Sequence, residues 1–177
     1  MAKREGFAMA FLETNRLVLS HLRQDDATAM LSVVGDRCTM IHYPRPLDRG
    51  VVNSWIEQAR AAYSTRGLGL FGVSLRDTGE FIGDCGFLFP TVDGQARTEL
   101  GYHIGRRWWN QGYATEAAAA CLRYAADKIQ GSELISLILP YNLQSRRVAE
   151  KNGATVARET DYKGLHHLIY VYPSPLR

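Results

Sequence analysis

The nine residues 109–117, WNQGYATEA, have the composition and the spacing of a phosphate-binding turn. They lie between an alternating stretch at 98–104, typical of a strand, and a long amphipathic stretch, typical of a helix. The first N–H groups of a helix have no partner within it, and the helix dipole favours negative charge at that end. Because Gly112 is followed by the small residues Ala114 and Thr115, a diphosphate has close access to the backbone. The segment therefore predicts an anion site made of backbone amides.

The elements that hold this turn follow from the periodicity of the apolar residues. Alternating or continuous apolar stretches predict strands, and apolar residues three and four apart predict helices. Asp25 or Asp26, and then Asp48, are expected to cap two early helices, and Gly79 supplies a positive φ for a hairpin turn. In chain order we expect a strand from about 16, helices after 26 and 48, strands at 70–75 and 81–89, a turn at 91–95, a strand ending near 104, a helix with apolar residues from 114 to 129, a strand at 134–139, a short helix from about 142 to 153, and one or two final strands, the last at 166–172.

This order predicts a single domain of the α+β (mixed α/β) class, because antiparallel hairpins come first and only one β-α-β crossover follows. The chain of 177 residues is long enough for one domain and too short for two ordinary ones, so the domain is expected to span 1–177, with residues 1–11 as an N-terminal extension. No GxGxxG follows an early strand. A Rossmann oxidoreductase is therefore disfavoured.

The composition is that of a globular protein, with 46% hydrophobic and 22% charged residues. A net charge of +3 without a run of Lys or Arg argues against nucleic acid and suits an anionic small ligand. No apolar run is long enough to cross a membrane, and no secretory leader is evident, so the cytoplasm is the expected location. Cys38, Cys85 and Cys121 match neither a metal pair nor a disulfide framework. We expect reduced, mostly buried thiols and find no convincing metal-binding pattern.

Four segments resemble the GNAT superfamily of N-acetyltransferases, and within it the ribosomal-protein N-terminal (RimJ/RimL-like) branch. They are TNRLVL at 14–19, ELGYHI at 99–104, WNQGYATEA at 109–117, and NLQS at 142–145 running on to EKNGA at 150–154. Their order and separations cover nearly the whole chain. The resemblance implies the GNAT fold, a largely antiparallel central sheet with flanking helices. In that fold the strand before the turn splays from the strand after the following helix, here 98–104 and 134–139.

The same resemblance implies acetyl-CoA as the cosubstrate and no metal. Amides from about Gln111 to Thr115 would hold its pyrophosphate, and backbone groups of Tyr102 and Ile104 would pair with its pantetheine arm like an added strand. Trp109 stands where the family motif has Gln or Arg, which matters little because backbone amides make the contacts. The implied cofactor-binding set is Tyr102, Ile104, Trp109, Asn110, Gln111, Gly112, Tyr113, Ala114, Thr115 and Asn142. For Asn142, a plain helix cap is the alternative, and both roles are compatible.

Glu99 is the implied general base, working through water on the acceptor amine. The alternative is a solvated strand residue or an ion-pair partner of Arg97 or Arg106. A peptide α-amine, with a pKa of about 7.7–8.0, demands less of a base than a lysine near 10.4. A weak base would therefore suit α-amines.

Ser145 is the implied general acid, because the tyrosine that many family members place before the Glu-Lys pair is Ala149 here. The alternative for Ser145 is that it helps to cap the short helix. The oxyanion donor is expected at the N–H of Ile104 or of its neighbour. His103 alternates with Tyr102 on the same strand, and a catalytic role is not expected for it. The loop at 42–46 is a weaker candidate for the acceptor site.

The leading function is acetyl transfer from acetyl-CoA to a primary amine, by direct attack through a tetrahedral intermediate. The acceptor would be a protein N-terminus or a small-molecule amine, and the sequence does not choose between them. The alternative is a non-catalytic acyl-CoA-binding module, which the missing tyrosine favours and the presence of Glu99 and Ser145 disfavours. No nucleic acid or membrane partner is expected, and a homodimer through a strand edge near the C-terminus stays open.

Overall fold

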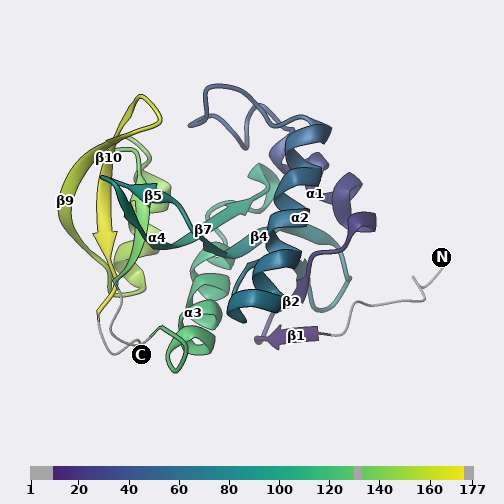
Figure 1. Ribbon diagram of the computed structural model, residues 1–177. Helices are drawn as coiled ribbons and strands as arrows, with labels where there is room; N and C mark the ends of the chain where they lie inside the picture. Colours follow the sequence, from purple (N-terminus) through teal and green to yellow (C-terminus); the bar gives the residue numbers. More distant parts are fainter. Residues whose placement is uncertain (1–9, 130–132, 174–177) are drawn as a thin grey trace.

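A central sheet of eight strands organises the molecule (Figure 1), which a computed structural model describes over residues 10–129 and 133–173. The strand order across the sheet is β1-β2-β3-β4-β7-β8-β10-β9, antiparallel throughout except for the parallel pair β7–β8. The strands are β1 (Ala10–Glu13), β2 (Leu17–His21), β3 (Leu70–Leu75), β4 (Phe81–Leu88), β7 (Thr98–Ile104), β8 (Leu134–Ile138), β9 (Thr155–Tyr162) and β10 (Leu165–Val171). A separate two-stranded ladder joins β5 (Thr91–Val92) to β6 (Gln95–Ala96). The predicted α+β fold is confirmed.

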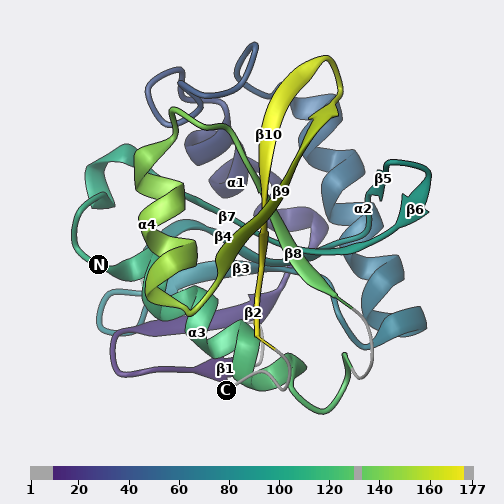
Figure 2. The same ribbon diagram turned by 90° about the vertical axis from the view of Figure 1, so that its left-hand side faces the viewer.

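Four helices cover the sheet, α1 (Ala27–Val34) and α2 (Arg49–Arg66) on one face and α3 (Tyr113–Ala125) and α4 (Leu143–Lys151) on the other (Figure 2). Short 3₁₀ turns precede α1 and α3, η1 (Gln24–Asp26) and η2 (Arg106–Trp108). Asp48 caps α2 as predicted, because its carboxylate accepts a hydrogen bond from the Val51 N–H at 3.0 Å. The helix ends at Arg66, and Gly67, with a φ of 63°, caps its last turn.

The core has two parts, because the two faces of the sheet bury different helices. On the α3 side, small residues of the helix such as Ala117, Ala118 and Cys121 are fully buried, which lets the helix lie close to β4 and β7. On the other side, Met30, Val52 and Ile56 pack against Leu70 of β3. Each fully buried large apolar side chain contributes about 1.5–3 kcal/mol. Both faces of the sheet are therefore fixed, and the strand register with them.

The parallel pair β7–β8 forms a fork. The two strands pair only at Thr98–Leu134 and Glu99–Ile135. Beyond that point, side chains bridge the gap: the Glu99 carboxylate accepts the Leu137 N–H at 3.3 Å, and the Ser136 hydroxyl donates to the carbonyl of Leu100. The predicted splayed pair is therefore present.

Backbone groups of β7 face the opening of this fork. The Gly105 N–H donates to Ile82 at the β4 side, whereas the Leu100 carbonyl points to the β8 side. Successive residues of a strand present their N–H and C=O groups to opposite neighbours. The groups of Tyr102 and Ile104 consequently face the gap, where β8 does not pair with them.

Four local expectations need correction. Residues 10 and 11, expected in the N-terminal extension, begin β1; residues 1–9 lie outside the described part of the chain. The expected turn at 91–95 is the β5–β6 hairpin, with Asp93 and Gly94 at positive φ. Helix α3 ends at Ala125, before Ile129. The Asp26 carboxylate accepts the N–H of Arg23, preceding it, and makes no cap bond to α1.

Candidate active site

A cavity of about 720 Å³ opens at the fork of β7 and β8. Its walls come from β7, the turn at 108–115, the end of β8, the start of α4, the loop at 39–44 and the β9–β10 turn. All of the predicted catalytic and cofactor-binding residues line this cavity, with the single exception of Gln111. The fold therefore brings three of the four sequence motifs to one cavity, and the fourth lies behind the turn.

The turn at 109–115 presents free amides at one end of the cavity. Asn110 and Gly112 adopt positive φ values of 60° and 83°. The first backbone bond of α3 runs from the Glu116 N–H to the Gly112 carbonyl at 3.0 Å. Among the described residues, the amides from Gly112 to Thr115 have no acceptor. Such a set of unpaired donors at a helix N-terminus fits a phosphate group.

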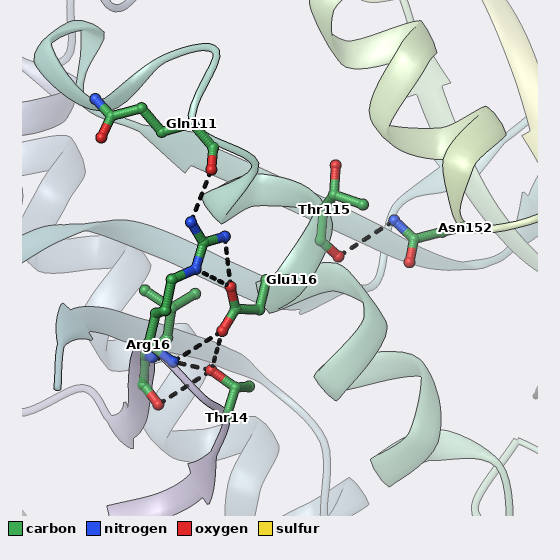
Figure 3. Close-up of polar contacts among 7 residues, drawn as sticks. Thr14, Arg16, Gln111, Thr115, Glu116 and Asn152 are labelled. Atoms are coloured by element: carbon green, nitrogen blue, oxygen red, sulfur yellow. Dashed lines mark hydrogen bonds and ion pairs between the residues drawn. The ribbon is translucent and has the colours of Figure 1, made fainter.

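An ion pair between exposed Arg16 and half-buried Glu116 holds the turn from behind (Figure 3). Arg16, just before β2, contacts the Glu116 carboxylate through Nε and Nη2, both at 2.6 Å, and its Nη1 donates to the Gln111 carbonyl at 2.9 Å. The Thr14 hydroxyl donates to the same carboxylate at 2.6 Å. Burial alone would raise the pKa of Glu116, but these donors outweigh it and keep the pKa below its usual value. The Arg16 guanidinium also lies 4.5 Å from the centre of the Tyr113 ring, so the turn is fixed before any ligand binds.

Two further contacts tie the turn to its neighbours. The Asn152 amide, at the end of α4, donates to the Thr115 carbonyl at 3.4 Å (Figure 3). The Trp109 indole donates to the Ile104 carbonyl at 2.6 Å, so this predicted cofactor residue links the end of β7 to the turn. Residues of all four sequence motifs thus contact one another around the cavity.

Glu99 lies at the base of the fork, half-buried in the cavity wall. Burial raises the pKa of its carboxyl group, the Leu137 N–H, His103 and Lys163 lower it, and the net result is a pKa of about 7. Its expected alternatives do not match this environment. Arg97 pairs instead with Glu133 at 2.9 Å, and the Arg106 side chain lies over the Trp109 ring. A carboxyl group with this pKa can accept a proton near neutral pH.

Ser145 and Asn142 come together at the first turn of α4. Asn142 is the N-cap, because its Oδ1 accepts the Ser145 N–H at 3.1 Å. Tyr102 of β7 donates its hydroxyl to the Ser145 carbonyl at 2.8 Å. The cap that was the alternative role of Ser145 is therefore made by the Asn142 side chain, with Ser145 supplying only its amide.

The other end of the cavity holds three linked polar side chains, Tyr43, His103 and Asp84. Sequence reasoning named the loop that carries Tyr43 as a weaker candidate for the acceptor site, but it did not predict the contacts to His103 and Asp84. His103 Nδ1 lies 2.8 Å from Asp84 Oδ1, and Nε2 lies 2.7 Å from the Tyr43 hydroxyl. Asp84 is fully buried in β4, directly opposite His103 in the ladder. Burial lowers the pKa of His103, but Tyr43 and Asp84 outweigh that effect and bring it well above its usual value. The signal in the sequence was one Asp within the apolar stretch at 81–89, since a buried carboxylate requires a partner.

The structure also bears on the predictions about the cysteines, a metal site and a membrane span. Cys85 and Cys121 are buried and Cys38 is exposed, all three as free thiols. Within 10–129 and 133–173, no group of three or more His, Cys, Asp or Glu side chains is placed to hold a metal ion. In the same residues, no helix has the length and apolar character needed to span a membrane.

Comparison with known proteins identifies the family. Residues 16–155 match the Acetyltransferase (GNAT) domain family. The chain is 35% identical over 143 residues to the protein YkkB of Bacillus subtilis, which covers 80% of this chain and 83% of YkkB.

Solved structures share the fold. An acetyltransferase from Agrobacterium tumefaciens superposes with a TM-score of 0.79 at 26% identity, over 98% of this chain and 100% of that one. RimL, a ribosomal L7/L12 α-N-protein acetyltransferase solved with coenzyme A, gives a TM-score of 0.73 at 15% identity, over 93% and 97% of the two chains. With the fork and the free-amide turn, these matches place the chain in the GNAT family, as an acetyl-CoA-dependent N-acetyltransferase.

Proposed function

We propose that this N-acetyltransferase moves the acetyl group directly to a primary amine, with Glu99 as the general base. Acetyl-CoA supplies the acetyl thioester. The amine nitrogen bonds to the carbonyl carbon, the C–S bond breaks, and the amine proton goes to Glu99, directly or through water. The observation that carries this proposal is the position and the pKa of Glu99. Its half-buried carboxyl group lies at the base of the open strand edge and has a pKa of about 7.

Direct transfer is favoured over an acetylated enzyme by the positions of the thiols. Cys85 and Cys121 are buried, and burial raises the pKa of Cys85. Cys38 is exposed and outside the cavity wall. In the part of the chain that the structure describes, no thiol therefore lies where it could take the acetyl group.

The cofactor-binding roles follow the shape of the cavity. In our proposal, the free amides of the turn from about Gln111 to Thr115, with Trp109 and Asn110, surround the pyrophosphate. The backbone groups of Tyr102 and Ile104 pair with the pantetheine arm, and the Ile104 N–H stabilises the oxyanion. Asn142 reaches the same arm beside its cap. Ser145 protonates the leaving thiolate, a modest contribution because an ordinary hydroxyl is a poor acid.

The acceptor class is the finer part of the proposal. A base with a pKa near 7 suits an α-amine, of a protein N-terminus or a small molecule, better than a lysine side chain. RimL is named as an α-N-protein acetyltransferase, which agrees with an α-amine. The cytoplasmic location and a homodimer stay predictions.

The test is the pH profile of kcat/KM for an α-amine acceptor in wild type and in Glu99→Gln, with acetyl-CoA affinity measured by calorimetry. We expect the wild-type rate to rise with pH through about 7, because only the ionised carboxylate accepts a proton. The variant should lose about 10²-fold and this limb of the profile, while acetyl-CoA affinity is retained. Equal rates for both proteins across pH 6 to 9 would exclude Glu99 as the base.

A further inference from the structure

The end of the cavity that holds Tyr43 and His103 has no role in the chemistry proposed above. Tyr43, on the loop before α2, is 43% exposed, and its hydroxyl is held by His103. The His103 ring contacts the Tyr43 and Trp55 rings, with both centroid distances at 5.5 Å. Because Tyr43 lines the same cavity as Glu99, its hydroxyl is placed to contact an acceptor.

The buried partner decides which way the hydrogen bonds run. Asp84 is 0% exposed, and its Oδ2 has no partner among the described residues. His103 is therefore the group that compensates the Asp84 charge, which favours the doubly protonated ring. In that form Nδ1–H donates to Asp84 and Nε2–H donates to Tyr43. The Tyr43 hydroxyl then accepts from His103 and has its own proton left to donate into the cavity.

The charges of the cavity wall also favour an acceptor that carries an anionic group. Glu99 is the one carboxylate in the described wall, which also carries Arg147, Lys151 and Lys163. Arg147 and Lys151 belong to α4, next to the turn, whereas Lys163 belongs to the β9–β10 turn and acts electrostatically on Glu99. An acceptor whose only charge is an ammonium group would be repelled by Lys163 and by a charged His103. An acceptor that also carries an anionic group would be attracted by these two residues.

The spacing along β7 sets the size of such a molecule. Glu99 and His103 lie four residues apart, so their side chains share one face of the strand, with Cα atoms about 13 Å apart. Gly101, between them, presents no side chain on that face, and the cavity reaches its backbone. A small molecule or the end of a peptide can lie across Gly101 with one end at Glu99 and the other at the Tyr43 hydroxyl, which His103 holds.

We propose that the acceptor amine also carries an anionic oxygen group, a carboxylate or a phosphate, which accepts the hydrogen bond of the Tyr43 hydroxyl while the amine faces Glu99. This inference rests on the proposed function. His103 and Asp84 are positioning residues, because they orient and polarise Tyr43 without contacting the acceptor.

The test compares amines with and without the anionic group. Three matched pairs serve: phenylalanine and 2-phenylethylamine, alanyl-phenylalanine and its C-terminal amide, and phosphoethanolamine and ethanolamine. For each pair we would measure the ratio of kcat/KM from full pH profiles, which removes differences in amine ionisation. Calorimetry with the CoA-bound enzyme would give the Kd of each anionic member. The first two pairs test a carboxylate at two distances from the amine, and the third tests a phosphate.

We expect at least one anionic member to be preferred by about tenfold or more, and the pair that shows it identifies the group. Tyr43→Phe should lower that preference at least threefold and raise the corresponding Kd in proportion. His103→Gln should act in the same direction. The matched control is Tyr141→Phe, on a 62% exposed tyrosine outside the cavity wall, which should leave the ratio unchanged. Tyr43 is partly exposed, so its variant should fold even if changes at buried Asp84 do not.

Ratios within twofold for all three pairs would overturn the inference, as would a preference that survives Tyr43→Phe. If no amine is acetylated, the inference would also be overturned when none of the three anionic members binds to the CoA-bound enzyme. These outcomes differ from failure of the proposed function, in which the amines are acetylated equally well after Glu99→Gln.

Discussion

The two ends of the cavity are built in different ways. At the turn end, the groups that we propose bind the cofactor are backbone amides of one short segment, and side chains hold that segment in place. At the Tyr43 end, the groups that face the cavity are side chains from a loop and β7, and their geometry depends on a third side chain from β4. The turn end therefore depends on the path of the backbone, and the Tyr43 end depends on the identity of a few side chains.

The two ends should respond differently to substitutions. A site made of backbone amides loses most of its affinity when the conformation of the chain is altered, whereas most side-chain substitutions lower its affinity only slightly. A side-chain site is altered by single substitutions that leave the fold intact. The predictions below test this contrast, beginning with the backbone.

Gly112→Val should have the largest effect, a rise in the Kd of CoA of about 100-fold. Gly112 has a φ of 83°, which costs an L-residue about 1–2 kcal/mol, and a Cβ there would lie 3.4 Å from Arg16 Nη2. Both effects displace the amides that have no protein acceptor. Calorimetry with CoA measures the change.

The matched control is Gly94→Val in the β5–β6 turn. Gly94 has a similar φ of 74°, and nothing lies within 4 Å of its added Cβ. It should lose a comparable amount of stability and none of the CoA affinity. Equal CoA affinity in the two variants would mean that the turn at 109–115 does not hold the cofactor.

The turn end was predictable from the sequence because its structure is local. A glycine at positive φ, small residues after it and an apolar stripe at helical spacing all lie within one segment, and Gly112, Ala114 and the start of α3 follow from them. The same holds for the β3–β4 hairpin with Gly79. Short β1 was missed because four residues carry too little periodicity for a prediction.

The Tyr43 end was not predictable in the same way. The pair Asp84–His103 depends on the register between β4 and β7, and the contact to Tyr43 depends on the path of a loop that no periodicity describes. The sequence held one clue, an ionisable residue in an apolar strand, which predicts a partner without identifying it. Glu99 was found by resemblance, but its contact to Leu137 needed the fork.

Glu99→Gln should stabilise the protein near neutral pH and have no such effect in acid. The pKa of Glu99 rises from 4.5 to about 7 on folding, so the folded protein resists ionisation of this group. Below about pH 4.5 the carboxyl group is protonated in both the folded and the unfolded protein, so it does not lower the free energy of unfolding. Above pH 7 the group is ionised in both, and its desolvation in the folded protein lowers the free energy of unfolding by the full amount. The Tm difference between variant and wild type should therefore grow between these pH values, to about 3 °C or more.

Thermal unfolding at pH 4.5 and pH 8 checks this expectation. Glu133→Gln is the control, because ion pairs with Arg97 and Arg158 stabilise its carboxylate and lower its pKa. Its Tm difference should have the opposite sign at pH 8. A Glu99→Gln difference that is equal at both pH values would show that burial does not raise this pKa.

Arg16→Gln should weaken CoA binding about five- to tenfold, roughly 1–1.4 kcal/mol. The variant loses the bond to the Gln111 carbonyl and the contacts to Glu116, but the backbone path of the turn remains. The loss is smaller than that of Gly112→Val because the amides are only less well fixed. Arg49→Gln, which breaks an exposed hydrogen bond to the Thr28 hydroxyl at 3.1 Å, is the control and should leave the CoA affinity unchanged. Equal affinities in both variants would remove the positioning role of Arg16.

Ser145→Ala should have the smallest effect, a fall in kcat of less than about threefold, since protonation of a thiolate seldom limits the rate when the donor is an ordinary hydroxyl. The α4 cap should survive, because Asn142 accepts the Ser145 backbone N–H and Tyr102 donates to its carbonyl. Steady-state kinetics beside Ser32→Ala, a serine of exposed α1 surface whose hydroxyl bonds its own helix, measures the difference. A loss near 10²-fold in Ser145→Ala alone would reverse the ranking, and would mean that protonation of the leaving thiolate by this hydroxyl limits the rate.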